Sequence, residues 1–139
     1  MSKIIVTGAN GYIGSAAAAA LADKGHIVTA GVRNSGGEGA SLTGVSQIGY
    51  GDLGARTDFR PILEGHEVVV HTAAIAHKAP PTRDSGLNYV ETVNYEVVAR
   101  LASAAVQTGV RQIVFLSSIA VHGPTTSGVA TVESSKINP

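Results

Sequence analysis

The chain contains no cysteine among its 139 residues. Without a thiol, it can form no disulfide, no thiolate metal site and no cysteine nucleophile. The histidines at 71, 77 and 122 lack the paired or helical spacing of metal ligands. We interpret each of them as a hydrogen-bonding group at a loop or strand end. The sequence therefore predicts no metal site.

An excess of charge of either sign is also lacking. Ten basic residues balance ten acidic ones and are scattered along the chain, so no overall field favours nucleic acid or an anionic membrane. No apolar run approaches the roughly 20 residues of a transmembrane helix. The first predicted strand begins at residue 3, which leaves no room for a signal peptide. We expect a cytoplasmic protein that binds neither nucleic acid nor membrane.

The sequence does contain short apolar runs that alternate with segments of helical period, within a length that fits one domain. The predicted strands span residues 3–7, 27–32, 45–50, 67–72 and 112–116. The predicted helices span 12–24, 58–64 (with Asp58 as a candidate cap) and 89–108, and each is followed by a glycine. We expect a Gly- and Ser-rich loop at 34–44 and a second loop, which contains Ala79-Pro80-Pro81, around 79–81. We assign no firm structure after Gly123. Strands that are uniformly apolar are typical of a parallel sheet covered on both faces. We therefore predict a doubly wound, Rossmann-like α/β fold of about five strands, in the order 3-2-1-4-5.

The stretch TGANGYIG, residues 7–14, joins the first predicted strand to the first predicted helix. Backbone N–H groups in such a turn, together with the positive end of the helix dipole, form an anion site. Gly8 permits the tight turn, Gly11 lets a diphosphate approach the backbone, and Gly14 lets the helix pack closely on the sheet. No Lys-Ser or Lys-Thr follows, which argues against a P-loop. A glycine turn without a ligand is the alternative, but the context favours a dinucleotide.

These residues resemble the TGxxGxxG motif of the extended short-chain dehydrogenase/reductase superfamily, the NAD(P)-dependent nucleotide-sugar epimerases and dehydratases. Four further stretches are similar to that family and occur in the same order. They are GDL at 51–53, HTAAIAH at 71–77, Asn94 in the long predicted helix, and FLSSIAVHG at 115–123, with His122 where the family commonly has tyrosine. The resemblance covers essentially the whole chain.

The resemblance implies an NAD(P) site and, in the complete protein, a nucleotide-sugar substrate. Because a parallel sheet cannot leave its apolar faces uncovered, we also expect the isolated domain to be marginally stable or to oligomerise, with a homodimer as the partner arrangement. In this family Asp52 would contact the adenine, Asn94 would lie near the nicotinamide half, and Ser118 would be the catalytic residue that polarises the substrate oxygen. Asp52 as a turn cap and Ser118 as a strand-end hydrogen bonder remain alternatives. The implied cofactor-binding residues are Thr7, Gly8, Asn10, Gly11, Tyr12, Ile13, Gly14, Arg33, Asp52, Leu53, Thr72, Ala73, Ala74, Asn94 and Ser117.

The end of the second predicted strand bears on which nicotinamide cofactor is bound. NAD enzymes usually place a carboxylate there to hold the ribose hydroxyls, whereas this chain has Val32. The next residue, Arg33, is suited to pairing with a 2′-phosphate or stacking on adenine. A solvated arginine at a loop start is the alternative. The pattern favours NADP without excluding NAD.

The family's hydride transfer between a sugar carbon and nicotinamide uses a tyrosine from a YxxxK pair, and this chain has no such pair. Its tyrosines are at 12, 50, 89 and 95, and the tail SSKINP at 134–139 resembles the segment that precedes the catalytic tyrosine. We therefore expect residues 1–139 to be an NAD(P)-binding domain, truncated before YxxxK and the C-terminal substrate lobe and inactive alone. A non-catalytic dinucleotide-binding or redox-sensing module is the alternative.

Five consecutive alanines, at 16–20, follow the glycine motif. Alanine has the highest helix propensity, and its small side chain permits close packing on a sheet. The same run leaves this predicted helix with little bulk to fill a core.

Overall fold

The structure, a computed structural model, describes residues 1–35, 44–54, 56–75, 89–124, 128 and 130–138. His77, the predicted loop around 79–81 and most of the predicted loop at 34–44 lie outside these residues. The strands are β1 (Lys3–Thr7), β2 (Ile27–Val32), β3 (Ser46–Gly49), β4 (Val68–His71) and β5 (Gln112–Phe115). The helices are α1 (Tyr12–Asp23), α2 (Arg60–Leu63), η1 (Thr92–Glu96), α4 (Val97–Thr108) and η2 (Ile119–His122).

The five strands form one sheet in the order β3-β2-β1-β4-β5, and all neighbouring pairs are parallel. The predicted order and fold class are confirmed. Central strand β1 is paired on both sides, so that Thr7 lies opposite Gly31 of β2 and His71 of β4. The carboxyl ends of these three strands therefore meet at one edge of the sheet, where ligands of such folds bind.

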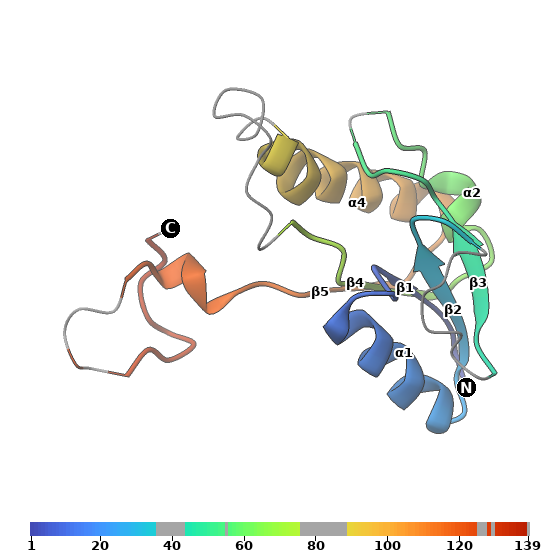
Figure 1. Cartoon of the computed structure of the whole chain (residues 1–139), viewed down its shortest axis with the longest axis horizontal. Helices are drawn as coiled ribbons and strands as arrows, with labels where there is room; N and C mark the ends of the chain where they lie inside the picture. Colours follow the sequence, from blue (N-terminus) through green and yellow to red (C-terminus); the bar gives the residue numbers. More distant parts are fainter. Residues whose placement is uncertain (36–43, 55, 76–88, 125–127, 129, 139) are drawn as a thin grey trace.

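Helices cover both faces of the sheet, with α1 on one face and α2 and α4 on the other (Figure 1). Because strand side chains alternate between faces, β1 contributes to two separate apolar clusters. Ile5 packs with Phe59, Leu63 and Leu101 beneath α2 and α4. On the other face, Ile4 and Val6 pack among small residues, including the fully buried Ala18 of α1.

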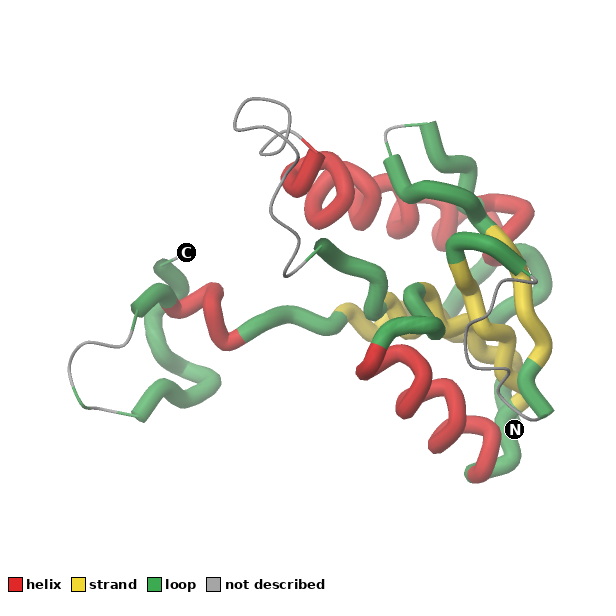
Figure 2. Tube along the Cα trace, in the orientation of Figure 1, coloured by secondary structure: helices red, strands yellow, loops and turns green. Residues whose placement is uncertain are grey.

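Strand β5 differs from the expectation that every apolar strand is buried. Its exposed fractions rise from 37% at Ile113 to 50% at Phe115. The strand lies at the edge of the sheet, and the segment after it leads η2 away from the body of the domain (Figure 2). Among the described residues, therefore, only part of β5 is covered.

The long predicted helix is present but not regular. It is helical from residue 89, passes through the π-helical segment η1, and continues as α4 to Thr108. Gly109 ends it in the left-handed conformation, with φ +76°, as predicted. Within the described residues, no helix has both the length and the apolar character needed to cross a membrane.

Candidate functional site

The glycine turn between β1 and α1 is packed tightly against the loop that follows β4. Gly8 has φ +73°, and a Cβ atom there would lie 2.7 Å from the backbone nitrogen of Ala73. Gly14 is buried, and a Cβ atom on it would lie 2.6 Å from Oγ1 of Thr72. Both positions therefore require glycine, which agrees with the packing roles predicted for them.

The start of α1 presents backbone N–H groups that have no acceptor within the described residues. The N–H of Gly11 donates to the Gly8 carbonyl at 2.9 Å, and the N–H of Ser15 donates to the Gly11 carbonyl at 2.9 Å. Between them, no described group accepts the N–H of Tyr12 or Ile13, nor does one accept that of Asn10. Unpaired N–H groups at a helix N-terminus are suited to binding a phosphate.

A cleft of about 480 Å³ opens beside this turn. Eight of the predicted cofactor residues line it: Gly8, Asn10, Gly11, Arg33, Leu53, Thr72, Ala73 and Ala74. Five residues that were not predicted complete it: Tyr50, Gly51, Ile75, Tyr89 and Val93. The cleft thus combines residues from the ends of β1, β2, β3 and β4 with residues at the start of the long helix.

Other predicted residues surround the cleft without lining it. Tyr12 and Ile13 are exposed, at 95% and 56%, and contribute their backbone N–H groups. Gly14 lies buried below the turn. Thr7 is fully buried and pairs with the His71 ring, with 2.7 Å between Oγ1 and Nδ1. In the described structure these four residues therefore adjoin the turn and line no part of the cleft.

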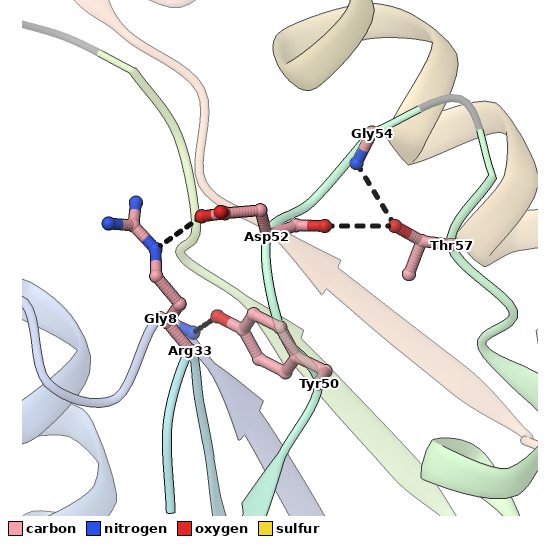
Figure 3. A network of polar contacts seen from close by, with 6 residues as sticks. All are labelled: Gly8, Arg33, Tyr50, Asp52, Gly54 and Thr57. Carbon is pink, nitrogen blue, oxygen red and sulfur yellow. Dashed lines mark hydrogen bonds and ion pairs between the residues drawn. The ribbon is translucent and has the colours of Figure 1, made fainter. Parts of the chain in front are cut away.

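Arg33 and Asp52 form an ion pair at the mouth of the cleft (Figure 3). Nε of Arg33 lies 2.9 Å from Oδ1 of Asp52, and both side chains are largely exposed. Asp52 itself lines an adjacent hollow with Tyr50 and Leu53. The pair fixes the guanidinium through Nε, and Figure 3 shows its two terminal nitrogens directed away from the carboxylate.

Asn94, in the π-helical segment, holds the backbone of Ile75 with both ends of its amide. The Ile75 N–H donates to Oδ1 at 2.9 Å, and Nδ2 donates to the Ile75 carbonyl at 3.0 Å. Asn94 therefore fixes one wall of the cleft without lining it. The π-helical turn around it is a feature often found at functional sites.

Ser117 and Ser118 are exposed and lie on the segment that leaves the sheet after β5. The Ser118 hydroxyl accepts the N–H of Ala120 at 3.2 Å and so caps the short helix η2. Neither serine lines the cleft. The described structure therefore does not bring the predicted catalytic serine together with the glycine turn.

The electrostatics of the site are dominated by burial. Burial lowers the pKa of His71 to about 4, because a charged imidazolium loses its hydration there. His71 also stacks on Phe115, with ring centroids 6.0 Å apart. Burial raises the pKa of Tyr50, while its hydrogen bond from Gly8 and the charge of Arg33 act in the opposite direction. Both side chains are therefore uncharged at neutral pH.

Tyr50 is one of the five lining residues that the sequence does not predict, and it makes a hydrogen bond to the glycine turn. It directly precedes the GDL stretch and was assigned only as the end of a strand. Its hydroxyl accepts the N–H of Gly8 at 3.0 Å, a contact that joins two parts of the chain far apart in sequence. The only sequence signal was its place at the carboxyl end of a predicted strand.

Comparison with known proteins agrees with this geometry. Residues 4–139 match the model of the NAD dependent epimerase/dehydratase family. The UDP-glucose 4-epimerase of Vibrio cholerae is 34% identical, over 87% of this chain and 36% of that protein. The sterol demethylase protein B of Methylococcus capsulatus is also 34% identical, over 91% of this chain and 37% of that protein.

Among solved structures, MoeE5 in complex with UDP-glucose and NAD is 28% identical, with a TM-score of 0.79 over 99% of this chain and 42% of that one. The chain thus spans little more than a third of the length of the curated relatives it matches. The family match nevertheless covers nearly every residue of the chain. The chain belongs to the NAD-dependent epimerase/dehydratase family of the extended short-chain dehydrogenases/reductases.

Proposed function

We propose that this chain binds NAD(P) in the cleft and forms the cofactor-binding part of an epimerase/dehydratase-type oxidoreductase. The observation that carries the proposal is the start of α1, where the N–H groups of Asn10, Tyr12 and Ile13 have no described acceptor. They stand beside a cleft lined by Gly8 and Gly11. This donor set suits a diphosphate, which brings only oxygen acceptors.

The remaining residues suit the two ends of a dinucleotide. Arg33, Asp52 and Leu53 lie at the ends of β2 and β3, where an adenosine would bind. Thr72, Ala73 and Ala74 follow β4 on the other side of the turn, toward Asn94, and would adjoin the nicotinamide half. When bound, the nicotinamide supplies the hydride acceptor and donor of the family reaction.

Substitution of Gly11 tests the site directly. Gly11 is exposed and has φ −82°, so alanine is compatible with its backbone, and a Cβ atom there would approach the Gly8 carbonyl at 3.1 Å. We expect Gly11→Ala to weaken NAD binding about tenfold, or about 1.4 kcal/mol, measured by isothermal titration calorimetry. Ser103→Ala is the control, because Ser103 is exposed on α4 and lines neither the cleft nor the hollow beside it. Equal affinity for both variants would count against the proposal.

We further propose that Arg33 favours NADP by pairing with the 2′-phosphate. Its terminal nitrogens remain available while Nε is bonded to Asp52. A hydrogen bond to a charged group contributes about 1.5 to 3 kcal/mol, so we expect Arg33→Ala to weaken NADP binding about tenfold or more. NAD binding should stay within about twofold. If wild type binds both cofactors equally and Arg33→Ala changes neither affinity, the preference for NADP is wrong.

The substrate of the proposed reaction is a nucleotide sugar, with Ser118 polarising the substrate oxygen. This part of the proposal rests on the likeness to UDP-glucose 4-epimerase and to MoeE5. Because the 139 residues contain no YxxxK pair, we propose that the chain alone binds cofactor without turnover, as an NAD(P)-binding domain that acts with a YxxxK pair and a substrate lobe. A cytoplasmic location and a homodimer belong to the same proposal, and cell fractionation and analytical ultracentrifugation would test them.

A second candidate function is a dinucleotide-binding or redox-sensing module without catalysis. The exposed position of Ser118, which does not line the cleft, favours it. The two candidates differ in one measurement on the longest chain that the gene encodes. Turnover of UDP-glucose with NAD(P) supports the oxidoreductase, whereas NAD(P) binding without turnover of any nucleotide sugar supports the module.

A further inference from the structure

Tyr50 lies where β3 ends, two strands away from the glycine turn. Its N–H donates to the Val32 carbonyl at 3.0 Å, which extends the pairing of β3 with β2 by one residue. The next N–H, from Gly51, donates to the Arg33 carbonyl at 2.9 Å. The backbone at Tyr50 is therefore fixed to β2 on both sides of its side chain.

The Tyr50 side chain reaches from the end of β3 to Gly8, in the turn after β1 (Figure 3). In the strand order β3-β2-β1 the ring passes over Gly31 of β2. A Cβ atom on Gly31 would lie 3.2 Å from Cε1 of the ring, closer than ordinary van der Waals contact. The absence of a side chain at position 31 therefore provides the space that the ring occupies.

At the far end of the ring, the hydroxyl accepts the N–H of Gly8 at 3.0 Å. The next N–H of the turn, from Ala9, donates to the Gly31 carbonyl at 3.1 Å. Two successive peptide groups of the turn are thus held from the side of β2 and β3. The N–H groups that follow, at Asn10 and at the start of α1, have no described acceptor.

We propose that Tyr50 is a positioning residue of the dinucleotide site, which fixes the first glycine so that the following N–H groups face the diphosphate. The inference rests on the proposed function, because it concerns the same site. Gly8 has φ +73°, in the left-handed region that glycine adopts readily. Because glycine also adopts other backbone conformations readily, an added hydrogen bond helps to hold it in this one. The Tyr50 hydroxyl makes that bond from outside the turn.

Tyr50→Phe in the full chain removes the hydroxyl and keeps the ring over Gly31. Because one hydrogen bond contributes about 0.5 to 1.5 kcal/mol, we expect the Kd values for NAD and ADP to rise about two- to tenfold. The Kd for adenosine, which carries no phosphate, should change by less than about twofold. Tyr95→Phe is the matched control, since Tyr95 is 70% exposed and does not line the cleft; it should leave all three values unchanged.

A local measurement tests the contact without any ligand. In Tyr50→Phe the Gly8 amide should shift in the nitrogen–proton NMR spectrum and exchange faster with deuterium. The Ala9 amide should keep its exchange rate, because its acceptor is the Gly31 carbonyl. Gly31→Ala, which presses on the ring, should weaken NAD binding in the same direction, with unchanged circular dichroism.

The outcomes separate this inference from the proposed function. If wild type binds NAD and Tyr50→Phe binds NAD and ADP equally well, the inference is overturned and the proposed function stands. Equal weakening toward adenosine and ADP, or an unaltered Gly8 amide, also overturns it. If wild type binds no NAD, both proposals fail.

Discussion

The two faces of the sheet are packed in different ways. Under α2 and α4 the buried cluster contains large side chains, among them Phe59, Leu63 and Leu101, each at most 1% exposed. Under α1 the cluster is built from Val, Ile and three alanines, and α1 itself buries only Gly14 and Ala18. One face thus provides bulk apolar burial, whereas the other brings a helix close to the sheet. Close approach by α1 places its first N–H groups, which have no acceptor among the described residues, beside the carboxyl edge of the sheet.

Leu101→Ala is expected to have the largest effect, because it opens a cavity in the bulky face. Deleting a fully buried leucine side chain costs about 2 to 5 kcal/mol, and Leu101 is 0% exposed. Urea unfolding followed by circular dichroism would measure the loss. Val106→Ala on the same helix, at 82% exposed, is the control and should change the free energy of unfolding by less than about 0.5 kcal/mol. Similar values for both variants would contradict the assignment of this face as the main core.

Ala18→Leu tests the opposite property, closeness of packing, on the face of α1. Ala18 is 0% exposed, and added volume in a packed core costs about 1 to 3 kcal/mol. The same substitution at the exposed Ala16 is the control, with an expected change within about 0.5 kcal/mol. NAD titration of Ala18→Leu adds a second readout, because moving α1 outward should also weaken cofactor binding. A stable Ala18→Leu variant would show that this face has room to spare.

A smaller effect is expected from His71, on the bulky face. Thr7 and His71 are each two residues beyond a core residue, Ile5 and Val69, and so point to the same side of the sheet. The pKa of His71 is lowered to about 4 in the folded chain, against about 6.5 when unfolded. Neutral His71 contributes its full stability above pH 6.5, and that stability is lost as the pH falls toward 4. Between pH 7 and pH 5.5 we expect a loss of about 1 kcal/mol.

Urea unfolding at the two pH values would measure this loss, and His71→Leu should reduce it by about 1 kcal/mol. His66 also has a pKa lowered by burial. His66→Gln should therefore remove the separate part of the pH-dependent loss that His66 causes. The lowered pKa of Asp58, about 2, caused by its bonds to Arg60, lies outside this range. A pH dependence that His71→Leu does not change would contradict the prediction for His71.

Much of the fold could be predicted because its signals are local. Apolar runs of strand length and glycines after helices predict the five strands, the main helices and the strand order, and no predicted end differs from the structure by more than two residues. The π-helical segment around Asn94 could not be predicted, since it has no sequence period of its own. The exposure of β5 likewise depends on what packs against it, which no local pattern contains.

The site was partly predictable for a related reason. Gly8, Gly11 and Gly14 have a fixed spacing within one turn, and the structure shows the tight packing expected at Gly8 and Gly14. The contact of Gly11 with a diphosphate stays a prediction. The bond between Tyr50 and Gly8 depends instead on the width of one intervening strand and on the absent side chain at Gly31. Such a contact arises only when three strands are assembled.

The central place of β1 also has a consequence for how the chain is made. β1 leaves the ribosome well before its partner β4, since the Thr7–His71 pair spans 64 residues. At about 5 to 20 residues per second, β1 remains without that neighbour for several seconds of synthesis. Ile4, Ile5 and Val6, which are buried in the folded chain and pair with β4, lack that cover during the interval. The yield in the cell should therefore depend on translation speed and chaperone supply over the stretch from β1 to β4 more than over the stretch from β4 to β5.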